Sequence, residues 1–161
     1  MLAAMVLQDV TARIAAATAR SGRPAGAVTL VAVSKVQPLD RIEAVLRAGQ
    51  RVFGENRVQE AEGKWPPLRA RFPGTELHLV GPLQSNKLAR ALELFDAIHS
   101  LDRDSLARKL GQAVQARGTC PTLFLQVNTG REDPQNALGF PAFGAVAVIL
   151  WLMIARPLEI W

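Results

Sequence analysis

The chain has 161 residues, of which 49% are hydrophobic and 20% charged, and its formal net charge is +5. This composition is typical of a globular protein, and the length favours a single domain. The arginines are scattered, with no dense basic run and no interleaved aromatic residues, so we expect a solvated basic surface and no nucleic-acid groove. Cys120 is the single cysteine, which excludes an intrachain disulfide, fits a cytoplasmic location and is best read as a buried or inert thiol.

Helical and extended patterns alternate along most of the chain. In chain order they predict a helix over 2–20, a strand over 29–33, a helix from 39 that ends at Gly49, a strand within 51–56, a helix over 58–65 that Pro66 and Pro67 interrupt, a strand over 77–80, a helix capped by Ser85, a strand over 97–100, a helix from Asp102 or Asp104 to Gly118, and a strand over 122–127. Such alternation predicts an α/β fold with a parallel sheet and right-handed crossovers.

The last segment has a different composition from the rest. From Pro134 through Ala155 there is no charged residue, and residues 140–154 are apolar. We expect a buried helix or strand here in the first place and a disordered or aggregation-prone segment in the second. A membrane anchor comes third, because this run is shorter than the roughly 20 residues that a membrane helix needs. The first residues lack a basic region and do not resemble a signal peptide.

Lys35 ends the apolar run 31–35 and is therefore expected at the C-terminal end of a strand. Ligands of α/β proteins bind at this edge of the sheet, where loops converge. A partly desolvated lysine there can form a Schiff base with an aldehyde, although position alone fits a solvated lysine better.

Polar turns follow three of the predicted strands. Residues 34–35, 54–56 and 81–87 supply an amine, the amide of Asn56, and a predicted helix N-terminus with Lys87 nearby. Together these groups suit an anionic ligand that carries an aldehyde. His78 and His99 are expected to be structural, and with one cysteine elsewhere they predict no metal site.

Several motifs resemble one known family. The segments Val-Ala-Val-Ser-Lys at 31–35, Phe-Gly-Glu-Asn at 53–56 with Val-Gln-Glu at 58–60, His-Leu-Val-Gly-Pro-Leu-Gln-Ser-Asn-Lys at 78–87, and Ile-His-Ser-Leu-Asp at 98–102 are similar to the pyridoxal phosphate homeostasis protein family, YggS/PROSC. The resemblance covers about residues 5–133, and the segment 81–87 is highly specific.

The resemblance implies a TIM-barrel fold like the N-terminal domain of alanine racemase. It implies that pyridoxal 5'-phosphate (PLP) is held as a Schiff base on Lys35, with Asn56, Ser85, Asn86 and Lys87 in the cofactor site. It also implies PLP and vitamin B6 homeostasis without established catalysis, and delivery of PLP to apo-enzymes as partners. A PLP-dependent racemase is the alternative; the chain contains no tyrosine, which counts against the usual racemase arrangement.

The chain departs from a complete barrel, which takes about 250 residues. We expect an incomplete barrel of about five β/α units over 1–133 and an atypical apolar tail over 134–161, as a truncation or frameshift would produce. Phosphate is commonly held by the loops after strands 7 and 8 of such barrels, so we expect weak PLP binding, and a non-functional fragment is a further alternative. An unpaired sheet edge should follow the fifth strand.

Overall fold

A computed structural model of the protein describes residues 2–127. The elements in chain order are α1 (Leu2–Arg20), β1 (Ala32–Val33), α2 (Leu39–Arg47), β2 (Val52–Glu55), α3 (Val58–Arg71), β3 (Glu76–Leu79), the short 3-10 helix η1 (Ser85–Lys87), α4 (Leu88–Leu94), β4 (Ala97–Leu101), α5 (Asp104–Arg117) and β5 (Thr122–Leu125). The predicted α/β alternation is therefore confirmed. The expected tail over 134–161 lies outside the described residues.

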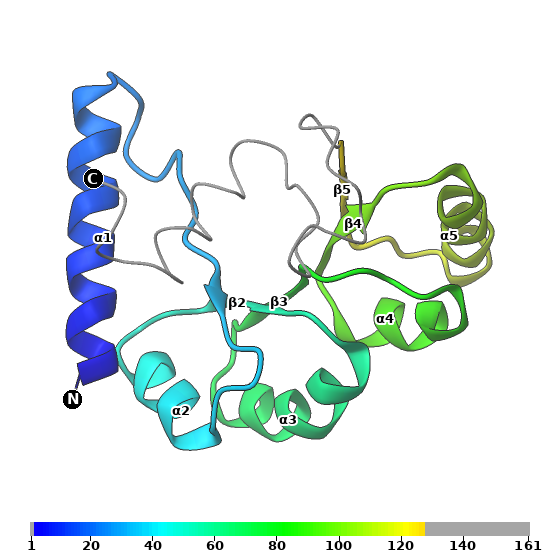
Figure 1. The fold of residues 1–161 in the computed structure, drawn as a ribbon, viewed down its shortest axis with the longest axis horizontal. Helices are drawn as coiled ribbons and strands as arrows, with labels where there is room; N and C mark the ends of the chain where they lie inside the picture. The colour runs from blue at the N-terminus through cyan, green and yellow to red at the C-terminus, as the bar shows by residue number, and fades with distance from the viewer. Residues whose placement is uncertain (1, 128–161) are drawn as a thin grey trace, which may run out of the picture.

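All five strands belong to one parallel sheet in the order β1-β2-β3-β4-β5. Helices α2, α3, α4 and α5 follow one another along one side of this sheet (Figure 1). The five described strands form an open arc, in which β1 and β5 each pair with one neighbour only. The unpaired edge expected after the fifth strand is thus present in the described part of the chain.

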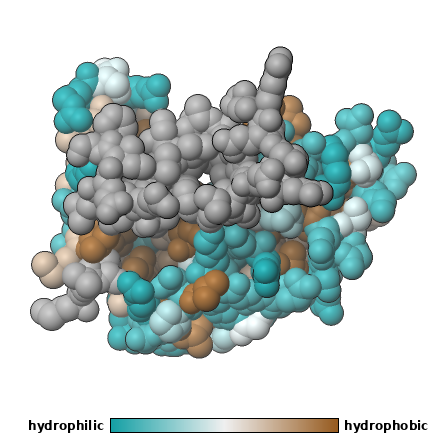
Figure 2. Space-filling model, in the orientation of Figure 1, coloured by the Kyte–Doolittle hydropathy of each residue, from teal (hydrophilic) through white to brown (hydrophobic). Residues whose placement is uncertain are grey.

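The main core lies between the sheet and these helices. Leu77 and Leu79 of β3 are fully buried there, together with Trp65 of α3 and Leu106 of α5. Side chains alternate along a strand, so His78, between the two leucines, points to the opposite face of the sheet. The surface over the helices is mostly hydrophilic, whereas hydrophobic residues show beside α1 (Figure 2).

Two predicted helix ends are confirmed. Gly49 lies just beyond α2 with a φ of 101°, and Gly118 caps α5 with a φ of 74°. Glycine takes this left-handed conformation without the steric cost of a Cβ atom. Of the two candidate start positions of the last helix, Asp104 is correct.

Other local predictions are wrong. Pro66 and Pro67 do not interrupt α3, which continues to Arg71, because Trp65 and Leu68 on either side of them are both buried in the core. Ser85 does not cap a helix: it lies in η1, and neither η1 nor α4 has a side-chain cap hydrogen bond. Cys120 is exposed, so the expectation of a buried thiol is wrong, whereas that of an inert thiol stays a prediction.

The first strand is shorter than predicted. Only Ala32 and Val33 pair with β2, and both are half-buried because β1 lies at an edge of the sheet. N-terminal to Ala32, the Gln50 side-chain amide takes the place of strand pairing: it donates hydrogen bonds to the Leu30 carbonyl at 2.7 Å and to the Val52 carbonyl of β2 at 2.6 Å. In β3, His78 is buried together with Leu77 and Leu79, as in a strand covered on both faces.

Among residues 2–127, no helix has the length and apolar character that crossing a membrane requires.

Candidate functional site

The predicted site residues all follow the C-terminal ends of strands. Lys35 lies in the turn after β1, Asn56 comes directly after β2, and Ser85, Asn86 and Lys87 form η1 after β3. Since the three strands are adjacent and parallel, these residues share one edge of the sheet. Within residues 2–127, the side chains of Asn56, Ser85, Asn86 and Lys87 form no hydrogen bond or ion pair, so their donors are available to a ligand.

Lys35 occupies the second position of a four-residue turn. The Gln37 N–H donates to the Ser34 carbonyl at 3.2 Å, which closes the turn. Val36, at the third position, has a φ of 57° and is 84% exposed. This is the left-handed region, where a β-branched residue costs about 1–3 kcal/mol. The backbone beside Lys35 is therefore strained and must be held by its surroundings.

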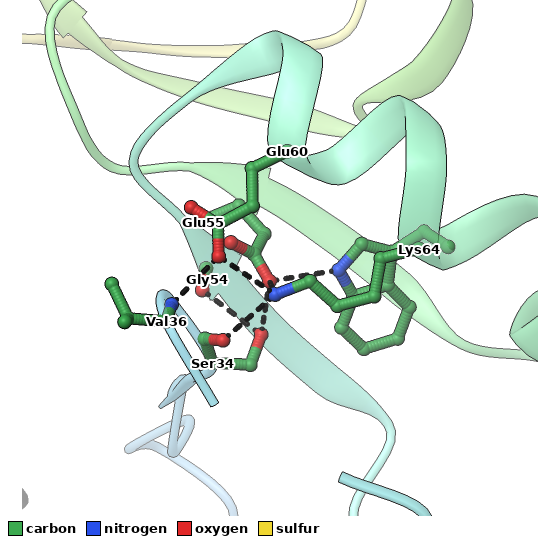
Figure 3. Close-up of polar contacts among 7 residues, drawn as sticks. Ser34, Val36, Gly54, Glu55, Glu60 and Lys64 are labelled. Carbon is green, nitrogen blue, oxygen red and sulfur yellow. Dashed lines mark hydrogen bonds and ion pairs between the residues drawn. The ribbon is translucent and has the colours of Figure 1, made fainter. Parts of the chain in front are cut away.

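A buried polar network holds this turn, and Lys64 of α3 lies at its centre (Figure 3). Its amine donates to the Ser34 carbonyl at 2.9 Å, to Glu55 Oε1 at 2.8 Å and to Glu60 Oε1 at 3.0 Å. The Val36 N–H donates to Glu60 Oε1 at 2.6 Å. The residues on both sides of Lys35 are thus fastened to α3.

Glu55 anchors the other side of the network on β2. It is fully buried, and its Oε1 accepts hydrogen bonds from Ser34 Oγ at 2.6 Å and Trp65 Nε1 at 3.0 Å in addition to the one from Lys64. Its Oε2 is buried and has no hydrogen-bond partner in the described part of the chain. A carboxylate in such a place depends on its cationic partner, because a buried charge without one is costly.

Two glycines let the strand ends approach one another beneath the turn. A Cβ at Gly81 would lie 2.7 Å from the Cα of Asn56, so only glycine allows this contact between the segments that follow β2 and β3. A Cβ at Gly54 would lie 3.2–3.3 Å from the side chains of Val31, Val33 and Val80, which close over this position. The edge that carries Lys35 and Asn56 is therefore tightly packed.

The surroundings shift the acid–base properties of two site residues. Partial burial lowers the pKa of Lys35, which increases the fraction of neutral amine at neutral pH. Partial burial acts to raise the pKa of Glu60, but the hydrogen bond from Val36 and the Lys64 ammonium outweigh it and hold that pKa below its usual value. Glu60 is consequently charged at neutral pH, while burial favours the neutral form of the Lys35 amine.

The sequence reasoning did not identify Glu55, Glu60 and Lys64 as site residues. Glu55 and Glu60 lie within the motifs at 53–56 and 58–60, whereas Lys64 belongs to no motif. Glu60 and Lys64 are four residues apart on a helix, which is a spacing for ion pairs, yet the same spacing is common on solvated helix surfaces. Their burial under the Lys35 turn is a property of the fold.

The two histidines lie on the face of the sheet opposite the main core. His99 Nε2 and His78 Nδ1 are 3.0 Å apart, and the His99 ring stacks on Phe124 with centroids 4.3 Å apart. Burial, and to a smaller extent His78, lowers the pKa of His99 to about 4. No group of three or more potential metal ligands occurs in the described ranges.

Comparison with known proteins places this geometry in a family. Residues 7–155 match the family model described as alanine racemase, N-terminal domain. The chain belongs to this family. Its N-terminal domain fold accounts for the parallel α/β arc, which corresponds to part of a TIM-type barrel that the five described strands do not close.

Curated relatives carry a more specific name. The chain is 37% identical over 134 residues to the pyridoxal phosphate homeostasis protein of Vibrio cholerae, in a match that covers 82% of this chain and 57% of the relative. It is 38% identical over 133 residues to the protein of that name from Escherichia coli strain K12. The chain therefore spans a little over half the length of these relatives.

A solved structure supports the same assignment. PipY of Synechococcus elongatus PCC7942, solved with PLP bound, is 41% identical to the chain with a TM-score of 0.66, over 83% of this chain and 59% of PipY. The predicted family and fold class are both confirmed.

Proposed function

We propose that the chain binds PLP as a member of the group of pyridoxal phosphate homeostasis proteins, with the cofactor attached covalently to Lys35. The observation that carries this proposal is the place of Lys35: half-buried at the carboxyl edge of the sheet, with a lowered pKa, in a chain 41% identical to a protein solved with PLP bound. An amine that is partly neutral at this edge fits an aldehyde ligand.

PLP supplies an aldehyde, a ring and a phosphate when it is bound. Lys35 would hold the aldehyde end of PLP as a Schiff base, and the carbonyl oxygen would be released as water with the two hydrogens of the neutral amine. Asn56 can donate from its amide, and Ser85, Asn86 and Lys87 offer hydroxyl, amide and ammonium donors from η1. These four side chains have no competing partner among residues 2–127. The proposed roles of all five residues rest on this arrangement.

We further propose that the chain holds and delivers PLP without a reaction of its own, and that its partners are PLP-dependent apo-enzymes. The names of the relatives refer to homeostasis, which supports a binding role. A cytoplasmic location and a boundary between a partial barrel and a tail at residue 133 stay predictions. Weak PLP binding is also expected, since the described residues hold five strands of a barrel type that uses later loops for phosphate.

Borohydride trapping tests the covalent attachment. The 161-residue chain is incubated with PLP, reduced and digested, and the modified lysine is located by mass spectrometry. We expect the adduct on Lys35, its loss in Lys35→Ala, and its retention in Lys109→Ala, the control on the exposed surface of α5. An adduct shared among all lysines would refute a specific site.

The competing functions have their own signatures. A racemase would exchange the α-proton of an amino acid with deuterium oxide when PLP is present, and we expect no such exchange. A non-functional fragment would be insoluble on expression and would take up no cofactor. Monodisperse protein with a visible Schiff-base absorption band would exclude the fragment alternative.

A further inference from the structure

Val36 is the most exposed large hydrophobic residue in the described part of the chain, and yet its backbone is strained. The residue is 84% exposed, so packing contributes little to its left-handed φ of 57°. The Val36 N–H donates to Glu60 Oε1 at 2.6 Å. This hydrogen bond to a charged carboxylate offsets the energetic cost of the left-handed backbone at Val36.

Glu60 is itself held in place from below. Its Oε1 also accepts from Lys64 Nζ at 3.0 Å, and Lys64 fixes the Ser34 carbonyl on the other side of Lys35. Figure 3 shows Glu60 above Val36, reaching from α3 toward the turn. Side chains of α3 thus hold Ser34 and Val36, the residues on either side of Lys35, and thereby fix the backbone direction at Lys35.

We propose that Glu60 is a positioning residue for Lys35: by fixing Val36 in the left-handed conformation, its carboxylate sets the direction in which the lysine side chain leaves the turn. The inference rests on the proposed function in so far as that direction matters for PLP. Glu60 acts through the Val36 backbone and has no reaction with the ligand itself.

Residue 36 provides a way to separate positioning from general stabilisation. Glycine takes a left-handed φ without strain, so in a Val36→Gly background the turn no longer needs the hydrogen bond from Glu60. If Glu60 positions the turn, Glu60→Ala must do less harm in that background. If Glu60 only stabilises α3 through Lys64, its removal does the same harm in both backgrounds.

The experiment uses the full chain as wild type, Glu60→Ala, Glu60→Gln, Val36→Gly and the double variant. Glu62→Gln is the matched control, because Glu62 lies on the same helix and pairs with Arg90 at 3.5 Å, away from the turn. Two quantities are measured. The first is the rate of reductive methylation of Lys35 by formaldehyde with cyanoborohydride as the hydride donor, in the absence of PLP, as a function of pH and with Lys109 as internal reference. The second is the dissociation constant of PLP.

We expect Glu60→Ala to shift the pH profile of Lys35 methylation upward, because a released turn exposes the amine and its pKa returns toward the ordinary value. PLP affinity should fall about tenfold, as for the loss of a hydrogen bond to a charged group. Glu60→Gln keeps an acceptor oxygen and should retain affinity within about threefold of wild type. In the Val36→Gly background, Glu60→Ala should also cost less than about threefold, and Glu62→Gln should change neither quantity.

An unchanged Lys35 profile in Glu60→Ala, or an equal loss of affinity in both backgrounds, overturns the proposal. If Glu60→Ala fails to fold while the double variant folds, relief of strain at residue 36 is supported; if both fail to fold, Glu60 is a structural residue and the proposal is wrong. If the wild type takes up no PLP, the proposed function fails, while the methylation profiles still decide the positioning role.

Discussion

Lys64 places a positive charge in the interior, directly beneath the turn that carries Lys35. Its side chain is 9% exposed, and it faces a Glu55 side chain that is 0% exposed. Charges of this kind contribute little net stability as a pair, but either one alone is expensive. Stability therefore depends on the presence of both Lys64 and Glu55.

We predict that Lys64→Met destabilises the protein by about 3–5 kcal/mol, because it leaves the Glu55 carboxylate buried without its cation. Urea unfolding measures the change. Glu55→Gln combined with Lys64→Met should cost less than the sum of the two single changes, since the double variant buries no charge at either position. Lys109→Met on the exposed face of α5 is the control and should stay within about 0.5 kcal/mol of wild type. A Lys64→Met protein as stable as that control would contradict the prediction.

Gly81 leaves no room for a side chain, because the Asn56 backbone lies against it. We predict that Gly81→Ala destabilises the fold by about 1–3 kcal/mol, because its Cβ would press on the Asn56 backbone and force the two strand ends apart. Gly111→Ala is the matched control: a Cβ there meets nothing within 4 Å, and alanine in a helix should stabilise by about 0.5–1 kcal/mol. Thermal unfolding of the two variants should therefore shift in opposite directions, and a shift of the same sign would refute the account.

At the scale of elements, α3 contributes both to the core and to the site. One face buries Ala61, Trp65 and Leu68, and the same helix supplies Glu60 and Lys64 to the Lys35 turn. It does so although two consecutive prolines lie within it. Proline inside a helix removes a backbone hydrogen bond and crowds the preceding turn.

We predict that Pro66→Ala combined with Pro67→Ala raises the free energy of unfolding by about 1–2 kcal/mol. Both side chains are exposed, so no packing is lost, and the helix regains backbone donors, while the more flexible unfolded chain offsets part of the gain. Denaturant titration monitored by circular dichroism measures the change. A less stable double variant would show that the prolines hold α3 in a bend that the core requires.

Sequence patterns predicted the order and kind of the main elements, because the apolar spacings differ clearly between helices and strands. They also located Lys35, since a lysine ending a β-branched run marks a strand end. They did not predict that α3 passes through Pro66 and Pro67, because burial of the helix face outweighs the local penalty. They did not predict the roles of Glu55 and Lys64, because nothing local distinguishes a buried ion pair from a surface one.

At the scale of the whole molecule, stability should depend on pH through the histidine pair. His99 has a pKa of about 4 in the folded protein, against 6.5 as the ordinary value that the unfolded chain approaches. Between these values the unfolded chain binds more protons, so stability falls as the pH is lowered from about 6.5 to about 4, and this group causes no further loss of stability below about pH 4.

We predict that His99 contributes a loss of about 1–2 kcal/mol over this pH interval, with allowance for the partial exposure of the ring. Urea unfolding of wild type and His99→Gln at several pH values measures it. The difference between the two free energies of unfolding should change with pH in this window and be constant above it. Parallel curves for the two proteins would show that the imidazole titrates normally.

The spatial order of the strands, which equals their order along the chain, has a consequence for how the protein is made. Among the five described strands, each pairs only with strands adjacent in sequence, so each β/α unit can dock on the one before it as it leaves the ribosome. An array with neighbour-only contacts gains stability unit by unit, as in repeat proteins. The turn that carries Lys35 and its buried network involve residues of β1, β2 and α3, so they can form before β4 and β5 are translated.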